Sequence, residues 1–143
     1  MKIAIGADHA GFEFKELLKK YIVELGYEIK DFGAYSYNKE DGFPDFALPA
    51  ARSVSNGEYD RGVLVCGSGI GVSIAANKVR GIRAVNCTSE DFAKLSRLHN
   101  DTNVICFPGR FLDIEEAKKY FKVWMETEFL GGKYEERNKL LDF

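Results

Sequence analysis

"VLVCGSGIGVSIAANK", residues 63–78, runs from an apolar segment through three glycines at alternate positions into a second apolar segment. The residues "GVLVC", at 62–66, are apolar enough to form a strand that is buried on both faces of a sheet. Gly67, Gly69 and Gly71 follow, and a helix is expected from about 69 to 78. A buried strand that leads through a glycine loop into a helix indicates a parallel α/β sheet.

The same alternation of short apolar runs and helical periodicity continues along the chain. We expect strands at residues 2–6, 27–33, 62–66, 82–87 and 103–107. We expect helices at residues 14–25, 46–56, 69–78, 89–98 and 113–127, and a short helical tail at about 134–143. The sequence therefore predicts a Rossmann-like three-layer α/β/α sandwich with a five-stranded parallel sheet.

Length and local signals refine this prediction. Thr88 with Asp91 is expected to cap the fourth helix, and Asp113 with Glu116 is expected to start the fifth. With 143 residues the chain is long enough for one domain and too short for two ordinary ones. We therefore expect a single domain over residues 1–143.

Composition excludes several classes of protein. Hydrophobic residues make up 45% and charged residues 29%, and the net charge of −2 offers no general attraction to nucleic acid or to anionic lipid. The start "MKIAIGADH" turns polar early, and no apolar run approaches the ~20 residues of a membrane span, so we expect a cytoplasmic protein. Three cysteines without CxxC spacing, with only two histidines, predict reduced thiols and no structural zinc site.

Ligands of parallel α/β sheets bind beyond the carboxyl ends of the strands. The segments expected there read "ADHAG", "CGSGIG", "CTSED" and "PGRF". Cys66 precedes the glycine loop, whose backbone N–H groups can converge on an anion at a helix N-terminus. The loop lacks the dinucleotide fingerprint and the P-loop lysine, so it suits an anion or an enolate better than NAD or ATP. Cys87 and Cys106 are expected to be ordinary core residues.

The other polar candidates each have an ordinary structural interpretation as well. Asp8 can cap the next helix or join His9 at the sheet edge. His99 can be a match for the dipole at the end of its helix. Arg110, Lys133 and Arg137 can be an ordinary solvated face or can bind a phosphate.

Over nearly its whole length the chain resembles type B ribose-5-phosphate isomerase, in the family that also contains the galactose-6-phosphate isomerase subunits. The stretches that carry the resemblance are "IAIGADHAGFEFK", "CGSGIGVSIAANKVRGIRA", "SRLHNDTNV" and "GGKYEER". The resemblance implies an aldose–ketose isomerase that interconverts ribose 5-phosphate and ribulose 5-phosphate through a cis-enediol, without metal or organic cofactor.

The resemblance also implies a role for each candidate residue. Cys66 is the base, and Ser68 with the amides of Gly67, Gly69, Ile70 and Gly71 holds the enediolate oxygens. His99 opens the furanose ring, while Asp8 and Asn100 bind sugar oxygens. The phosphate ligands are expected to be His9, Arg110, Lys133 and Arg137.

Several positions depart from the family pattern. The family branch that uses a glutamate base carries it where this chain has Val72, which favours cysteine. Lys133 stands where arginine is usual, Tyr134 where histidine is usual, Phe43 where tyrosine is usual, and Ser68 where threonine is commoner. The alternatives are a six-carbon substrate, galactose 6-phosphate or allose 6-phosphate, and a non-catalytic flavodoxin-like binding module.

Geometry adds an expectation about assembly. The helix that ends at His99 runs back from the carboxyl edge of the sheet, and about ten residues at 1.5 Å each span about 15 Å. The resemblance implies that Cys66 and His99 act on the same sugar, and one chain cannot easily bring both to it. We therefore expect a homodimer, or a pair of such dimers, with active sites shared between subunits.

Overall fold

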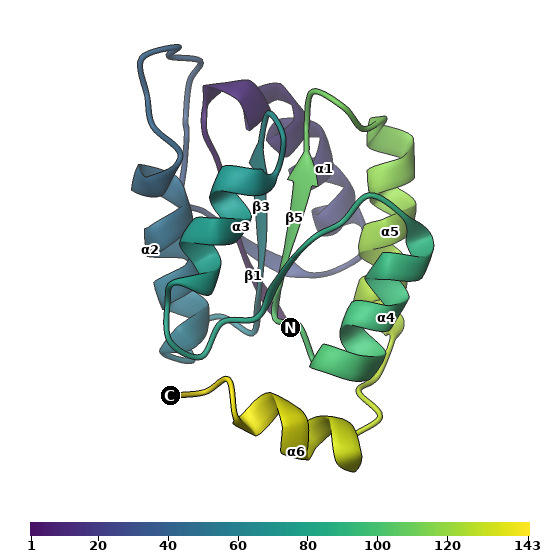
Figure 1. The fold of residues 1–143 in the computed structure, drawn as a ribbon. Helices are drawn as coiled ribbons and strands as arrows, with labels where there is room; N and C mark the ends of the chain where they lie inside the picture. The colour runs from purple at the N-terminus through teal and green to yellow at the C-terminus, as the bar shows by residue number, and fades with distance from the viewer.

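One sheet of five parallel strands forms the centre of the molecule in a computed structural model that describes residues 1–143 (Figure 1). The strands are β1 (Lys2–Ala7), β2 (Glu28–Asp31), β3 (Arg61–Cys66), β4 (Ala84–Asn86) and β5 (Val104–Pro108). Their spatial order is β2-β1-β3-β5-β4, and every neighbouring pair is parallel. The predicted five-stranded parallel sheet is confirmed.

Helices connect successive strands and cover both faces of the sheet. They are α1 (Phe12–Glu24), α2 (Pro44–Ser55), α3 (Ile70–Asn77), α4 (Glu90–Asn100), α5 (Ile114–Glu126) and α6 (Lys133–Lys139), with a 3₁₀ turn at His9–Gly11. Figure 1 shows α2 and α3 on one face and α1, α4 and α5 on the other. The predicted three-layer sandwich is therefore confirmed. Every helix is too short or too polar to span a lipid bilayer.

Alternation along the central strands divides the core into two parts. Val63 and Val65 pack with α1, α4 and α5, whereas Leu64 and Cys66 pack with α2 and α3. The three valine and leucine side chains are fully buried, as expected for a strand covered on both faces. Each Å² of apolar surface that is buried contributes about 25 cal/mol to the free energy of folding. This burial on both faces holds the helices against the sheet.

The edge strands are shorter than the sequence predicted. The fourth strand was expected over residues 82–87, but only Ala84–Asn86 forms β4, because the pairing with β5 ends there. The second strand was expected over residues 27–33 and forms over Glu28–Asp31. An edge strand has one hydrogen-bonded neighbour, so apolar residues beyond the ladder, such as the buried Ile82, pack without being strand.

Several helix starts also differ from expectation, among them α1, which begins at Phe12 and not at residue 14. Ser89 caps α4, not Thr88, because its extended backbone lets the Ser89 Oγ accept a hydrogen bond from the Phe92 amide at 3.1 Å. Helix α2 begins at Pro44, two residues earlier than predicted, since a proline at the first helical position has no amide that needs a partner. Asp113 caps α5 as predicted, accepting from the Glu115 amide at 2.8 Å.

A buried lysine ties the first helix to the segment after β2. The Lys15 side chain is fully buried, and its Nζ donates to both carboxylate oxygens of Asp31, at 2.9 and 2.7 Å, and to the Ala34 carbonyl at 2.6 Å. Burial opposes ionisation of Asp31, but the hydrogen bonds from Lys15 and Lys19 outweigh it and lower the pKa of this carboxyl. The pair fixes the start of the loop that leads to α2.

We expect Asp31→Ala to lower the free energy of unfolding by about 3 kcal/mol, because it leaves the buried Lys15 charge without its main partner. The low pKa of Asp31 stabilises the fold above about pH 4, and this contribution is lost as the pH falls through the folded-state pKa. Urea unfolding at pH 7 and pH 3 measures both effects. Glu28→Ala, an exposed change on the same strand, should move stability by less than about 0.5 kcal/mol. Equal losses in the two variants would contradict this role.

Candidate active site

Three loops meet at the carboxyl edge of the sheet, where the strand order reverses between β1 and β3. They follow β1, β3 and β5, and they surround a pocket of about 370 Å³. The pocket is lined by Asp8, His9, Ala10, Phe43, Cys66, Gly67, Ser68, Gly71, Arg110 and Phe111. The segment "CTSED" is absent from this lining, because β4 lies at the sheet edge beyond β5. The expectation that all four segments contribute is therefore wrong for this one.

Cys66 lies at the floor of the pocket. It is the last residue of β3, pairs with Pro108 of β5, and is 5% exposed. Its carbonyl accepts a hydrogen bond from the Gly109 amide at 2.9 Å, so the ladder continues beyond the strands. The main chain at Cys66 is therefore held by bonds on the β5 side.

The other two cysteines belong to the core, as predicted. Cys87 and Cys106 are fully buried. Burial raises the pKa of Cys87 to about 11 and raises that of Cys106 well above its ordinary value. Neither lines the pocket, and thiols so hard to ionise supply little thiolate near neutral pH.

The glycine loop is shaped by close neighbours. Gly69 caps α3 in a left-handed conformation, with φ of 73°, and a Cβ there would overlap the Asn86 amide oxygen. Asn86 Nδ2 in turn donates to the Ser68 carbonyl at 3.1 Å. A Cβ at Gly71 would lie 3.0–3.1 Å from the Phe43 ring, which forms a wall of the pocket. Any other residue at Gly69 would strain the backbone and displace Asn86, and a side chain at Gly71 would crowd the Phe43 ring.

Ser68 and Arg110 complete the pocket's polar groups. Ser68 Oγ accepts from the Ile70 amide at 3.2 Å, so this one loop amide already has a partner. The Arg110 amide donates to the Gly67 carbonyl at 3.0 Å. A Cβ at Gly67 would lie 3.2 Å from the Arg110 side chain, so the missing side chain lets the arginine lie across the loop.

Asp8 fulfils both interpretations of its sequence position. Its Oδ1 accepts from the Gly11 amide at 3.2 Å and caps the 3₁₀ turn, while the residue also lines the pocket. Burial raises the pKa of Asp8, and nearby Asp41 acts in the same direction, although the Gly11 hydrogen bond and His9 oppose it. The Asp8 carboxyl therefore caps the turn and belongs to a residue that lines the pocket.

Asp41 contacts the pocket residue His9, and the sequence did not predict this contact. Its Oδ1 lies 2.7 Å from His9 Nδ1, and each of Asp8, His9 and Asp41 places one potential metal-ligand atom within 4.8 Å of the others. The loop that carries Asp41 has no periodic pattern, so only the acidic residue itself could have drawn attention to it.

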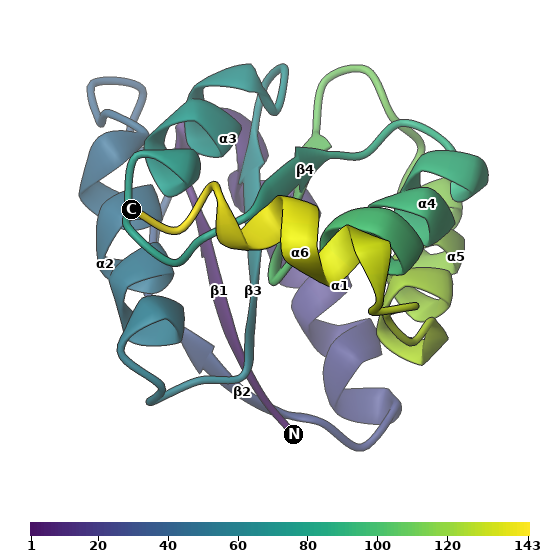
Figure 2. The same ribbon diagram turned by 60° about the horizontal axis from the view of Figure 1, so that its bottom comes forward.

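The remaining predicted residues lie at the other end of the sheet. His99 and Asn100 end α4, and Lys133 and Arg137 belong to α6, which packs against α4 (Figure 2). Figure 1 shows α6 beyond the amino-terminal ends of the strands. The pocket lies at the other end, beyond their carboxyl ends. The structure therefore brings the predicted residues together in two groups at opposite ends of the sheet.

Asn138 and Tyr134 organise this second group. The buried Asn138 donates to the His99 carbonyl at 2.8 Å and accepts from Asn100 Nδ2 at 3.1 Å. The Tyr134 ring stacks on the His99 ring with centroids 4.4 Å apart and planes 13° apart. Lys133 and Arg137 both lie within 6 Å of the same ring. An imidazole, an amide and two cations are thus held together by one chain.

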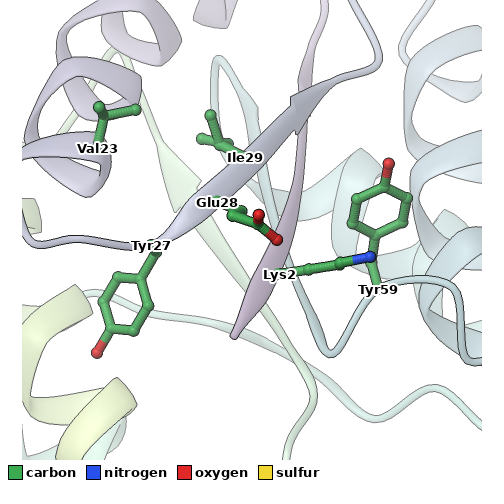
Figure 3. A pocket seen from close by; sticks show the side chains of 6 residues that line it. All are labelled: Lys2, Val23, Tyr27, Glu28, Ile29 and Tyr59. Carbon is green, nitrogen blue, oxygen red and sulfur yellow. The ribbon is translucent and has the colours of Figure 1, made fainter.

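A second pocket, of about 500 Å³, lies beside the amino end of β2 (Figure 3). Its lining residues are Lys2, Val23, Tyr27, Glu28, Ile29 and Tyr59. Figure 3 shows Tyr27 and Tyr59 on opposite sides of the strand, in agreement with their packing against different parts of the core. This second pocket contains no cysteine or histidine and lies away from the carboxyl edge. It is therefore not the candidate site.

Comparison with known proteins agrees with the pocket's chemistry. The sequence model of the family described as Ribose/Galactose Isomerase matches residues 3–141. The chain belongs to this family. It is 45% identical to ribose-5-phosphate isomerase B of Escherichia coli strain K12 over 136 residues, which cover 95% of this chain and 91% of the relative. It is 40% identical to D-erythrulose-4-phosphate isomerase 2 of Mycolicibacterium smegmatis over 131 residues, 90% of this chain and 86% of the relative.

Solved structures show the same fold. A ribose 5-phosphate isomerase from Thermotoga maritima superposes with a TM-score of 0.95 at 44% identity, covering 99% of this chain and 97% of that one. Ribose-5-phosphate isomerase B from Mycoplasma genitalium, solved with bound ribulose-5-phosphate, gives a TM-score of 0.93 at 34% identity, covering 98% and 93%. The protein is a sugar-phosphate aldose–ketose isomerase, and the flavodoxin-like alternative is set aside.

We expect Gly69→Ala to lower isomerase activity at least about tenfold, since the new Cβ displaces Asn86 and shifts the Ser68 peptide. The left-handed backbone should add about 1–2 kcal/mol of destabilisation. Gly57→Ala is the matched control, because Gly57 has φ of 85° and open space around its Cβ position. Initial rates and urea unfolding compare the two variants. Full activity of Gly69→Ala would show that the loop tolerates displacement.

Proposed function

We propose that the protein interconverts ribose 5-phosphate and ribulose 5-phosphate through a cis-enediolate, with Cys66 as the base. The observation that carries this proposal is the Cys66 thiol at the floor of a pocket that also contains the glycine loop, Asp8 and Arg110. The identity to enzymes named for this substrate, and the relative solved with ribulose-5-phosphate, support the choice of a pentose phosphate.

The chemistry requires a base next to C1 and C2 of the open-chain sugar. The Cys66 thiolate removes the C2 proton and returns it to C1, while a hydroxyl proton passes from O2 to O1. Ser68 and the free amides of the glycine loop stabilise the negative oxygen of the enediolate. Position 72, where the other family branch carries its glutamate base, is occupied by Val72, whose side chain is fully buried in the core. No carboxylate is present there, which supports cysteine as the base.

The phosphate and the ring oxygens are bound by the remaining residues. His9 and Arg110 contact the phosphate from the pocket, and Arg137 and Lys133 add charge from the second group. His99 opens the furanose ring, while Asp8 and Asn100 bind sugar hydroxyls. The phosphate lies away from the reacting carbons, so its binding energy positions C1 and C2 against the thiol.

The two groups of residues meet in a homodimer. The hollow beside β4 is lined by Asn86, which holds the glycine loop, and by Asn100, next to His99. Exposed apolar side chains flank it on two helices, Ile70 and Ile74 on α3 and Phe92 and Leu95 on α4. A two-fold copy packed on this face buries them and brings α4 of each subunit toward the glycine loop of the other. A pair of such dimers is compatible with the same sites.

A four-carbon sugar phosphate is the second candidate substrate. The relative named D-erythrulose-4-phosphate isomerase 2, at 40% identity, is the specific observation that favours it. A six-carbon phosphate is the third, since the family description includes galactose. The Phe43 ring limits the pocket beside the loop and offers no hydroxyl to an additional sugar oxygen.

A coupled assay with ribose 5-phosphate, erythrose 4-phosphate, galactose 6-phosphate and allose 6-phosphate tests the substrate. We expect the highest kcat/KM with ribose 5-phosphate. A higher value with any other sugar would transfer the proposal to that substrate.

Cys66→Ala should lower kcat by at least about 10³-fold while substrate binding changes little, because the thiol acts on carbon and the cations act elsewhere. Ribulose 5-phosphate affinity by calorimetry and steady-state rates separate the two effects. Cys87→Ala is the control, and it should cost stability while kcat stays near that of the wild type. Near-normal turnover by Cys66→Ala would show that another group is the base.

Complementation tests the shared site. Cys66→Ala and His99→Ala, each nearly inactive, should regain roughly a quarter of wild-type activity when co-refolded, since about half the dimers are mixed and each mixed dimer has one intact site of two. Native mass spectrometry confirms the mixing. Mixed dimers without activity would place both residues in one chain's site or remove His99 from the mechanism.

A further inference from the structure

Asp41 holds His9 at two points. Its Oδ1 accepts a hydrogen bond from the His9 backbone amide at 2.9 Å and lies 2.7 Å from His9 Nδ1. The two residues are 32 positions apart, with Asp41 in the loop between β2 and α2 and His9 directly after β1. One carboxylate oxygen thus fixes both the main chain and the ring of the same histidine.

The burial of Asp41 makes this contact specific. Its side chain is 10% exposed, and its second oxygen, Oδ2, is buried without a hydrogen-bond partner. A carboxylate removed from water needs a compensating donor, and the His9 ring is the only side chain bonded to Asp41. Tyr37 contacts the ring edge-on, with centroids 5.8 Å apart, so the imidazole has a second neighbour outside the pocket.

We propose that Asp41 is a positioning residue that holds the proton of His9 on Nδ1 and leaves Nε2 facing the substrate phosphate. The proposal rests on the proposed function, in which His9 is a phosphate ligand. A carboxylate only accepts hydrogen bonds, so the nitrogen beside it must carry a proton. The other nitrogen of the ring is then the atom available to the pocket that His9 lines.

The charges around His9 agree with this arrangement. Asp41 and Asp8 both face the ring, and Arg110 lines the same pocket from the loop after β5. When Nε2 is also protonated, the imidazolium is paired with Asp41 and donates outward to a phosphate oxygen. The hydrogen bond is then charge-assisted on both sides, which favours one fixed orientation of the ring.

Steady-state kinetics of a double-mutant cycle test the proposal. Asp41→Ala should raise KM for ribose 5-phosphate about tenfold and lower kcat by a smaller factor, since it weakens binding of the phosphate that positions the reacting carbons. His9→Ala should raise KM at least as much. The double variant should match His9→Ala, because Asp41 acts through this ring. Asp41→Asn, which keeps an acceptor, should retain most of the affinity, and Glu40→Ala, exposed in the same loop, is the control with wild-type KM.

Nitrogen NMR of the free protein provides a readout that does not depend on activity. The chain has two histidines, so ¹⁵N-histidine labelling gives two rings, and a His99→Gln sample assigns them. Near pH 8.5, where a free imidazole is neutral, wild-type His9 should carry its proton on Nδ1. In Asp41→Ala the ring should lose this preference, while in Asp41→Asn it should keep it.

Three outcomes would overturn the proposal. The first is a wild-type His9 without a proton on Nδ1. The second is a proton position that Asp41→Ala does not alter. The third is additivity of the two increases in KM in the double variant, as a purely structural loop contact would give. A wild-type protein that fails to isomerise ribose 5-phosphate would overturn the proposed function instead. The NMR experiment would still decide the position of the His9 proton. Circular dichroism identifies an Asp41→Ala protein that has not folded, in which case Asp41→Asn and the wild-type spectrum carry the test.

Discussion

Ala7 pairs with Val65, and Cys66 pairs with Pro108, because three buried parallel strands share one hydrogen-bonded register. This register brings the loops after β1, β3 and β5 out of the sheet at the same level. Two further bonds, from the Gly109 amide to the Cys66 carbonyl and from the Arg110 amide to the Gly67 carbonyl, continue it into the loops. The carboxylate, the thiol and the guanidinium of the pocket are neighbours as a direct consequence. A shift of one residue would turn Cys66 to the other face of the sheet.

Close packing around glycines converts this edge into a shaped pocket. A Cβ at Gly11 would lie 2.7 Å from Val65. The turn after β1 can therefore approach β3 this closely only because residue 11 has no side chain. Gly69 and Gly71 do the same toward Asn86 and Phe43. The loop gains fixed neighbours on both sides.

Buried charges connect the active-site loops to the body of the fold. Lys15 on α1 holds Asp31 at the end of β2, and the segment that follows carries Asp41 to His9. A carboxylate at each of these two contacts is matched by a cationic or proton-donating partner. The chain thus anchors the start of the loop with an ion pair, and the far part of the loop holds the His9 ring. At the amino-terminal end of the sheet, the buried Asn138 holds the end of α4 by donating to the His99 carbonyl and accepting from Asn100.

Local sequence determined the alternation of strands and helices, the central strands, the glycine loop and the placement of Cys66, Asp8 and His9 at one edge. These features depend on periodicity and on residues a few positions apart, which a single sequence displays directly. The lengths of β2 and β4 and the cap of α4 were decided by pairing and backbone conformation, so Ser89 took the place expected for Thr88. Tertiary structure alone decided the contacts of Ser68 with Asn86, His9 with Asp41 and His99 with Asn138, which span 18, 32 and 39 residues. No local pattern marks such pairs, because each depends on the order in which the strands and helices pack.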